Sequence, residues 1–595
     1  MNRVSAFVAL AWLLAAVPAV AQTSTDGTIR GHLRDEQGGV LPGVALSATS
    51  PTVPGTYTAI SDGEGLYRIL NLPPGQYTVT AELPGFSRFV RDGVYVRAGL
   101  NLTVDIVMKL GAVTETVEVK AETPMLETSN SVQAVNITGE FQRSVPITSR
   151  RNWSDVLSVA PGVVSAEGGI AGIAGYYFVR GAGNAQQKVA IDGADMGSSQ
   201  QATTNQTSLS TEALADTQIK TGANDASSPL GFGASLNMVT KSGTNTLHGT
   251  ASMTYQAMNW NANNVTGGTA PKEATSTPEV SLGGPIRKDR LWFFGAYRHQ
   301  GRSLAIARTA LELDTLKALY PSFEPFNNPD TGHFVFVKLT AQLGTHHQLN
   351  GYYQRDYNPN RAATPIDAEQ FGSAKGGGPG WSTSLSSVWN AALTTRFSAS
   401  YSAKSFERSF RSDRPGRPVF KSAFLSGGRL TGNTQVATLD NGNNGISLEQ
   451  PNYKYTLSAD ATYYRRTRGG AHEIKAGFYA QPKIHAEINL VYANSGFAAE
   501  GLVLRDPNNL AGGTIPFWRT IYDDVSITSS NADTADYAFY LQDNWRPTSR
   551  LTVNAGVRVD LIHRTDNLFD LQTQKSTEVG PRFGVNYMVT KDLRN

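Results

Sequence analysis

Short alternating runs dominate the first part of the chain. Between residues 27 and 110, apolar and polar positions alternate in short runs spaced about ten residues apart. Turn-forming sequences such as Asp62-Gly63-Glu64-Gly65 and Pro73-Pro74-Gly75 separate the runs. The runs are Thr28–Arg34, Val44–Ala48, Tyr57–Ile60, Leu66–Ile69, Gln76–Glu82, Val94–Val96 and Asn101–Met108. Because a period of two is the period of a β-strand, seven such strands predict an Ig-like sandwich.

Longer alternating runs fill residues 245–595. Leu393–Ala403, Tyr455–Tyr463 and Leu551–Asp560 each switch between apolar and polar at every position. Runs of nine to eleven residues match the span of a tilted strand that crosses a membrane. The pattern therefore predicts a transmembrane antiparallel β-barrel. A large soluble sandwich or propeller is the alternative, but the sequence shows no repeat of fixed period.

Aromatic and polar clusters suggest where these strands end. Leu291-Trp-Phe-Phe294 and Trp545 are expected in the aromatic girdles at the membrane surfaces. Three long polar segments are expected to be extracellular loops: Asn259–Thr277, Asn358–Ser382 and Asn433–Asn452.

The middle of the chain has a different pattern of apolar residues and turns. Short apolar strands alternate with glycine-rich turns, as in Tyr177-Phe-Val-Arg180-Gly181 and Val189-Ala-Ile191-Asp192-Gly193. This pattern predicts a compact mixed α/β domain. A β-branched run, Thr116-Val117-Glu118-Val119, precedes it and is followed by a polar stretch.

The amino terminus indicates secretion. Asn2 and Arg3 precede an apolar run over Val4–Val17, and Ala19-Val20-Ala21 forms a small-residue cleavage site. This is the pattern of a signal peptide over residues 1–21. No later run reaches 18 apolar residues, so the sequence predicts no membrane-spanning helix.

Composition narrows the class further. The chain has 52 Lys and Arg against 49 Asp and Glu, a net charge of +3, and only 17% of its residues are charged. A nearly neutral chain of 595 residues does not indicate a nucleic-acid partner. Cysteine is absent, which excludes disulfides, thiolate metal sites and cysteine nucleophiles.

Catalytic signatures are missing from the sequence. The nine histidines are scattered, and His346-His347 is the only adjacent pair. There is no G-x-S-x-G elbow, no G-x-x-x-x-G-K-[ST] phosphate loop and no dinucleotide fingerprint. We therefore expect no enzyme activity, no catalytic residues, no metal and no cofactor.

Two resemblances connect these regions to known families. The segment Ser61–Tyr77, together with Leu83-Pro-Gly-Phe86, resembles the carboxypeptidase regulatory-like domain, a non-catalytic transthyretin-like sandwich. The resemblance does not imply peptidase activity, since no His-Glu-x-x-His zinc motif is present. It leaves open a plain spacer or a glycan- or partner-binding module.

The second resemblance covers the rest of the chain. Arg180-Gly181, then Ile191-Asp192-Gly193, then a strand ending at Thr221-Gly222 and a junction over residues 237–249 resemble the plug of TonB-dependent outer-membrane receptors. Residues 280–295, 537–560 and 580–585 resemble the Oar-like branch of that family. The resemblance implies that the Ile191-Asp192-Gly193 hairpin belongs to the plug core and that Arg180 pairs with an acidic group.

The resemblance implies a function and partners. It indicates an outer-membrane receptor that imports a large nutrient, such as an oligosaccharide, peptide or chelate, with the sandwich and plug on the periplasmic side. TonB and its inner-membrane motor would supply energy, and Thr116, Val117, Glu118 and Val119 are the candidate TonB box that adds as a strand to TonB. Outer-membrane lipid and the barrel assembly machinery are the other expected partners. An adhesion or surface-structural protein on the same scaffold is the alternative.

Domain sizes complete the prediction. The expected organisation is a signal peptide (1–21), a sandwich (27–110), a linker (111–122), a plug (123–244) and a partial barrel (245–595). The family barrel has 22 strands, which need about 550 residues at roughly 25 per strand. Residues 245–595 supply 595 − 244 = 351, enough for roughly 14 strands. We therefore expect the chain to be an amino-terminal fragment of a longer protein.

Overall fold

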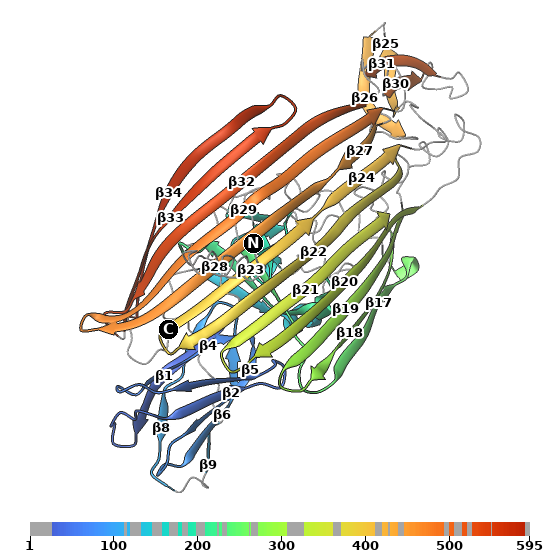
Figure 1. Ribbon diagram of the computed structural model, residues 1–595. Helices are drawn as coiled ribbons and strands as arrows, with labels where there is room; N and C mark the ends of the chain where they lie inside the picture. Colours follow the sequence, from blue (N-terminus) through green and yellow to red (C-terminus); the bar gives the residue numbers. More distant parts are fainter. Residues whose placement is uncertain are drawn as a thin grey trace, which may run out of the picture.

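The computed structural model places most of the chain in three β-rich bodies (Figure 1). It describes residues 26–111, 116–119, 133–145, 157–165, 177–180, 188–197, 209–222, 225–228, 235–260, 262, 272–305, 327–360, 371–410, 419–426, 429–437, 446–492, 499–504, 514–520, 526–548 and 550–588. The predicted signal peptide over residues 1–21 lies outside the described residues. Within them, no helix is both long and apolar enough to cross a membrane.

The first body is the predicted sandwich. One sheet has the order β3-β2-β5-β6-β9, and the other has β4-β1-β7 with β8 also on β1. Its strands are β1 (Gly27–Asp35), β2 (Ala45–Thr49), β3 (Thr56–Ile60), β4 (Leu66–Leu72), β5 (Gly75–Glu82), β6 (Arg88–Val96), β7 (Asn101–Thr103), β8 (Ile106–Met108) and β9 (Thr116–Val119). The predicted last strand is divided into β7 and β8, but Val104, Ile106 and Met108 all face the core, as their alternation predicted.

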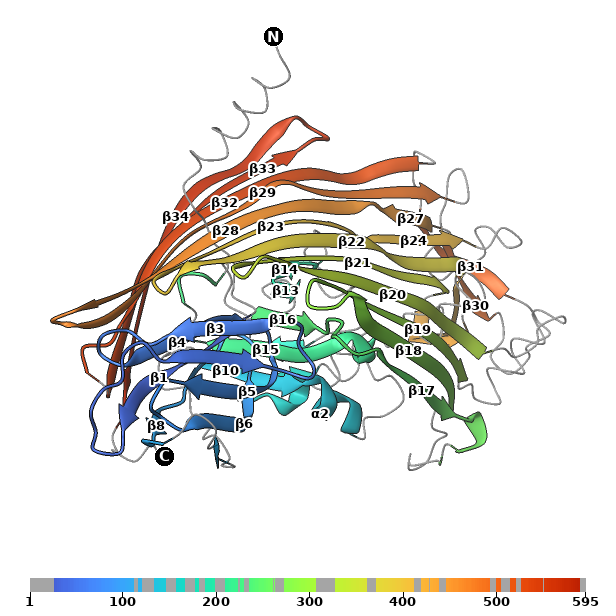
Figure 2. The same ribbon diagram turned by 60° about the horizontal axis from the view of Figure 1, so that its bottom comes forward.

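The second body is a small mixed domain that occupies the concave side of the third (Figure 2). Its sheet has the order β10-β15-β16-β13-β14. The elements are β10 (Gln133–Thr138), α2 (Gly139–Ser144), η1 (Leu157–Val159), β11 (Val163–Ser165), β12 (Tyr177–Val179), β13 (Lys188–Ile191), β14 (Ala194–Asp195), η3 (Thr211–Ala213), β15 (Leu214–Gly222) and β16 (Ser235–Thr240). Thr138 caps α2, since its hydroxyl accepts from the Phe141 N–H.

The third body is a curved wall of strongly tilted strands, an antiparallel sheet of fourteen. Its path runs from β17 to β34, and β24 and β27 extend it at the end farthest from the sandwich. The strands are β17 (His248–Gln256), β18 (Glu273–Arg287), β19 (Leu291–Ala305), β20 (Asn327–Leu343), β21 (His347–Asn360), β22 (Phe371–Asn390), β23 (Leu393–Ala403), β24 (Ser405–Phe410), β27 (Ile446–Gln450), β28 (Asn452–Thr467), β29 (Gly470–Tyr492), β32 (Ser526–Trp545), β33 (Leu551–Asp566) and β34 (Leu571–Tyr587). The wall is open, since β17 and β34 lie at its two edges among the described residues.

A separate small sheet lies beyond the wall, at the end opposite the sandwich. It has the order β26-β25-β30-β31 and is built from β25 (Val419–Ser426), β26 (Arg429–Ala437), β30 (Ala499–Leu504) and β31 (Thr514–Thr520). The turns at the sandwich end of the wall are short, as between Leu343 and His347. Outer-membrane barrels keep their short turns on the periplasmic side, which makes the sandwich end periplasmic.

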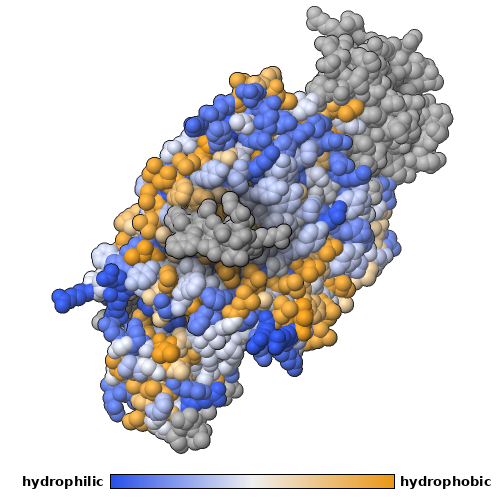
Figure 3. Space-filling view, viewed as in Figure 1, coloured by the Kyte–Doolittle hydropathy of each residue, from blue (hydrophilic) through white to orange (hydrophobic). Residues whose placement is uncertain are grey.

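The two faces of the wall have the opposite character to those of a soluble sheet. Inward-facing Thr456, Ser458 and Asp460 of β28 are 2–6% exposed, whereas outward-facing Tyr455 and Leu457 are 44% and 48% exposed. Figure 3 shows hydrophobic side chains gathered over β18–β20 and over β33 and β34, with hydrophilic ones near the strand ends. An apolar outer face over a polar lumen is the pattern of a wall that faces lipid.

Three expectations about the wall are wrong in detail. Most of the predicted loop Asn358–Ser382 belongs to β21 and β22, and part of Asn433–Asn452 belongs to β26 and β27. Part of Asn259–Thr277 likewise belongs to β18. These segments are polar because they form strands that continue past the apolar band, where cross-strand pairing with neighbours such as β24 outweighs low β-propensity. For the same reason β29 reaches 23 residues, about twice the predicted length.

The aromatic run at Leu291 is also placed differently. Trp292 and Phe294 are 0% and 1% exposed and face the lumen, so they do not belong to a girdle at the membrane surface. The Trp292 Nε1–H donates to Asn245 Oδ1 at 2.8 Å. Trp545, by contrast, is 36% exposed. Alternation predicts that residues 292 and 294 share a face, but not which face it is.

Candidate functional site

The described residues concentrate buried charge where the β13–β14 hairpin of the plug meets the wall. The turn is Asp192-Gly193, with φ of 48° and 82°. Two successive residues at positive φ form a type I′ turn, which favours glycine at its second position. The hairpin therefore reverses within two residues and brings Asp192 and Asp195 close to the lumenal face of the wall.

Asp192 binds a lysine of the wall and a strand of its own domain. Its Oδ2 lies 2.9 Å from Lys338 Nζ on β20. The same carboxylate accepts from the Thr240 N–H at 2.8 Å and from the Thr240 hydroxyl at 2.6 Å. Both groups of the ion pair are largely buried, with side chains 7% and 14% exposed. A paired and hydrogen-bonded carboxylate of this kind holds one geometry.

Asp195 makes a second and denser set of contacts. Its Oδ1 lies 2.6 Å from Lys454 Nζ on β28, and its Oδ2 accepts from Gln481 Nε2 of β29 at 3.1 Å. Burial alone would raise the pKa of Asp195, but the ammonium groups of Lys454 and Lys188 outweigh it and lower the pKa to about 2. The carboxylate therefore stays charged at neutral pH.

Backbone groups of the same turn also bind the wall. The Tyr352 hydroxyl on β21 donates to the Ile191 carbonyl at 3.0 Å, and Arg396 Nη2 on β23 donates to the Asp192 carbonyl at 3.2 Å. One plug hairpin is thus held by side chains from β20, β21, β23, β28 and β29. We call this set of contacts the latch.

Apolar packing supports the latch from one side. Phe294, Phe336 and Tyr352 of the wall belong to the same buried cluster as Ile191 and the rest of the plug core. The Phe336 ring lies 5.5 Å from that of Tyr352 and 6.4 Å from that of Phe294. The plug core is therefore completed by the barrel.

The predicted site residues fall into three groups. Ile191, Asp192 and Gly193 lie together in the latch. Arg180 directly follows β12 and is exposed, and its N–H donates to the Gly162 carbonyl at 2.9 Å; an acidic partner for its side chain stays a prediction. Gly181 lies outside the described residues.

The candidate TonB box lies at a sheet edge far from the latch. Thr116–Val119 form β9, which pairs in parallel with β6, Arg88 opposite Thr116 and Arg91 opposite Val119. Its role stays a prediction. Its backbone nevertheless has the extended form that strand addition requires.

Sequence reasoning missed the wall lysines and Asp195. Lys338 and Lys454 occupy inward positions of their strands; the next inward residues are Phe336 and Thr340 for the first, and Asn452 and Thr456 for the second. A single lysine on the polar register of a strand was the available signal, but nothing in the sequence pairs it with a particular aspartate. No cluster of three or more potential metal ligands occurs within the described residues.

Family comparisons agree with this architecture. Residues 28–109 match the carboxypeptidase regulatory-like domain, 126–231 the TonB-dependent receptor plug domain, and 239–319 with 317–567 an outer membrane beta barrel domain. The barrel match alone covers more than half of the chain.

Individual relatives are distant. The chain is 24% identical to the TonB-dependent transporter Oar of Myxococcus xanthus, over 98% of this chain and 62% of that protein. The ferric citrate transporter FecA in its unliganded form has a TM-score of 0.52 at 13% identity, covering 78% of this chain and 61% of FecA. The outer membrane transporter YddB from Escherichia coli has a TM-score of 0.50 at 14% identity, covering 76% and 58%.

The chain thus spans about three fifths of the length of the curated relative that it matches. The solved structures support the fold alone. A regulatory-like sandwich, a plug anchored by its Ile-Asp-Gly hairpin and an outer-membrane barrel wall occur here in one chain, which belongs to the family of TonB-dependent outer-membrane receptors.

Proposed function

We propose that this protein is an energised importer, which moves a large hydrophilic nutrient across the outer membrane when TonB displaces the plug. The observation that carries the proposal is the latch. Moving the hairpin away from the wall would separate Asp192 from Lys338 and Asp195 from Lys454. Buried charges that lose their partner cost several kcal/mol each, far above thermal energy.

Work must therefore come from outside the chain. In this family TonB supplies it by pairing with a short receptor strand, and β9 is the segment that fits. Its four residues are held only at the edge of the sandwich sheet, by β6 on one side. A strand on a sheet edge can leave it without unfolding the sheet behind it.

The polarity of the lumen indicates a broad class of substrate. Apart from the aromatic residues that pack on the plug, most inward positions of the wall are polar or charged, which suits oligosaccharides, peptides or chelates and disfavours lipids. The sandwich adds a weak preference for glycans by family association. Ferric citrate, named for FecA, is not carried over at 13% identity.

A proline in β9 tests the proposal. Val117→Pro removes an N–H and restrains the backbone, so strand addition to TonB should fail. Val117→Thr is the matched control, because it keeps the β-branch and the N–H. Three quantities are measured: capture of the receptor by the periplasmic domain of TonB, and both the surface binding and the accumulation of labelled oligosaccharides, peptides and ferric chelates in cells with and without TonB.

We expect Val117→Pro to lose both capture and TonB-dependent accumulation while surface binding persists, and Val117→Thr to keep all three. Capture that survives the proline would assign the TonB box elsewhere. If no compound accumulates in a TonB-dependent way in any strain, the adhesion or surface-structural role replaces the importer.

A further inference from the structure

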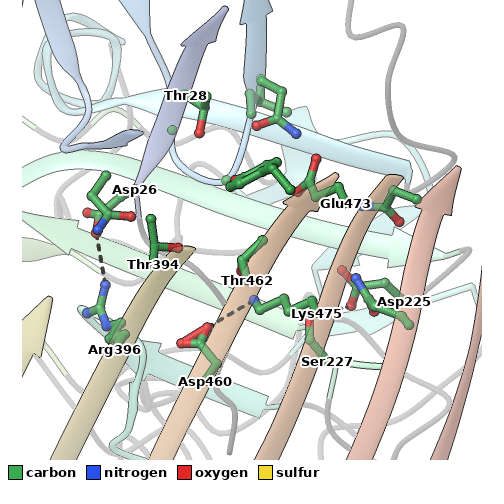
Figure 4. A pocket seen from close by; sticks show the side chains of 18 of the residues that line it. Asp26, Thr28, Asp225, Ser227, Thr394, Arg396, Asp460, Thr462, Glu473 and Lys475 are labelled. Carbon is green, nitrogen blue, oxygen red and sulfur yellow. Dashed lines mark hydrogen bonds and ion pairs between the residues drawn. The ribbon is translucent and has the colours of Figure 1, made fainter. Parts of the chain in front are cut away.

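A polar cavity of about 110 Å³ lies where all three bodies meet, near the periplasmic end of the wall (Figure 4). We call it the vestibule. The sandwich contributes Asp26 and Thr28 to its lining, the plug Lys220 and Asp225, and the wall Arg396 and Lys475. Its charged groups include both signs, as in the pair formed by Lys475 Nζ and Asp460 Oδ2 at 3.3 Å.

The vestibule is narrow and partly open to solvent in this conformation. It has room for a handful of water molecules but not for an oligosaccharide or a chelate. Strands β23, β28 and β29 line one side and the plug another, Thr28 of the sandwich lies on a further side, and Asp26 of the sandwich contacts Arg396 of β23 (Figure 4). The sandwich therefore covers a space between plug and wall.

The contacts that hold the sandwich to the wall are made by side chains. Asp26 Oδ2 lies 3.1 Å from Arg396 Nη1, and Glu64 Oε2 lies 2.8 Å from Arg466 Nε. The first pair is largely buried, and the second is about half exposed to solvent. Gln348 Nε2 donates to the Tyr57 hydroxyl at 3.2 Å, and the Arg68 guanidinium lies over the Tyr464 ring. The exposed pair separates easily in water, so the buried Asp26–Arg396 pair is the main ion pair that must break when the sandwich leaves the wall.

The contacts that hold the sandwich to the plug are buried and involve the backbone. The Ala98 N–H donates to Asp216 Oδ2 at 2.9 Å, and Gln218 Nε2 donates to the Ala98 carbonyl at 2.5 Å. Asp216 and Gln218 are 0% and 2% exposed. Opening this contact would leave buried polar groups unpaired, which opposes separation.

From this asymmetry we propose that the vestibule is the periplasmic exit of the import path and that the sandwich is its lid. The lid lifts from the wall while it stays on the plug. Because the lining is polar and carries both charges, the exit suits a hydrophilic substrate and disfavours an apolar one. The inference rests on the importer proposed above.

Labelling of a single thiol tests the lid without a known substrate. The chain has no cysteine, so Thr394→Cys places one thiol in the vestibule, at a position 7% exposed. The probe is fluorescein maleimide, added to cells that make the whole protein.

The release variant combines Asp26→Ala with Glu64→Ala. The matched control combines Glu36→Ala with Glu82→Ala, two carboxylates that pair within the sandwich. Rates are divided by that of Thr103→Cys, an exposed sandwich position.

We expect the release variant to react at least fivefold faster than the parent, and the control to match the parent. The parent should react several-fold faster in cells with TonB than in cells without it. Equal rates for release variant and control would overturn the lid. If the parent is labelled at the same rate with and without TonB, the vestibule is not the exit path. The accumulation assay with Val117→Pro tests the importer separately.

Discussion

The residues that anchor the plug are two aspartates three positions apart. Asp192 belongs to a recognisable motif, whereas Asp195 follows it in an ordinary strand. Both meet lysines that lie more than a hundred positions further along the chain. The sequence indicated that the hairpin is structural, but the pairing depends on which strands the plug faces. A charged partner can be identified only when the fold brings the two groups together.

At this scale the Asp195–Lys454 pair makes a sharp prediction. Asp195→Asn leaves the Lys454 ammonium, 5% exposed, without its carboxylate, so the plug–wall contact should weaken by about 3–5 kcal/mol. The double variant Asp195→Asn/Lys454→Met should recover most of that loss. The measurement is the urea concentration at which trypsin cleaves the plug at Lys220 or Lys241. A single variant that shifts this midpoint no more than Glu36→Ala does would contradict the latch.

At the scale of elements, alternation predicted the strands well and their surroundings less well. The faces of β2, β3, β8 and β28 follow from period two, whereas β1 is buried at five successive positions. The loops and the aromatic run at residues 291–294 were predicted wrongly. Polar strands continue outside the apolar band, and an inward-facing aromatic side chain can pack on the plug. Phe294, Phe336 and Tyr352 are such residues.

Phe336 measures how much the wall contributes to the plug core. Phe336→Ala removes a ring that is 1% exposed, and truncations of this size cost about 3–5 kcal/mol. Val335→Ala, on the outer face of the same strand, is the control and should cost far less. The trypsin assay again reports the plug, and heat-induced unfolding of the wall reports the barrel. Equal effects of both variants on plug cleavage would rule out this role.

At the scale of the whole molecule, the wall is apolar outside and polar inside. Its outer residues Val335, Val337 and Leu339 are 37–47% exposed, yet they belong to an apolar band rather than to a water-facing surface. Lipid replaces water as the solvent of that face, which explains why only 17% of the residues are charged.

The cost of an added charge at two positions along one strand tests whether this face lies in the membrane. Val337→Lys and Leu343→Lys both add a charge to the outer face of β20, at positions 45% and 47% exposed. We expect the first, far from the strand ends, to cost about 2–4 kcal/mol and the second, at the periplasmic end, about 1 kcal/mol or less. Folding titrations into lipid vesicles give both values. Equal costs would mean that this face does not lie in the membrane.

The sequence by itself determined the local features of this protein: a short-stranded sandwich, a glycine-rich plug and long alternating strands. These features follow from periodicity and turn chemistry, which act between neighbouring residues. Tertiary structure alone decided which face of each strand meets lipid, which lysines hold the plug and where the sandwich covers the lumen. Such contacts join residues as many as 402 positions apart, as between Glu64 and Arg466, so no local pattern can encode them.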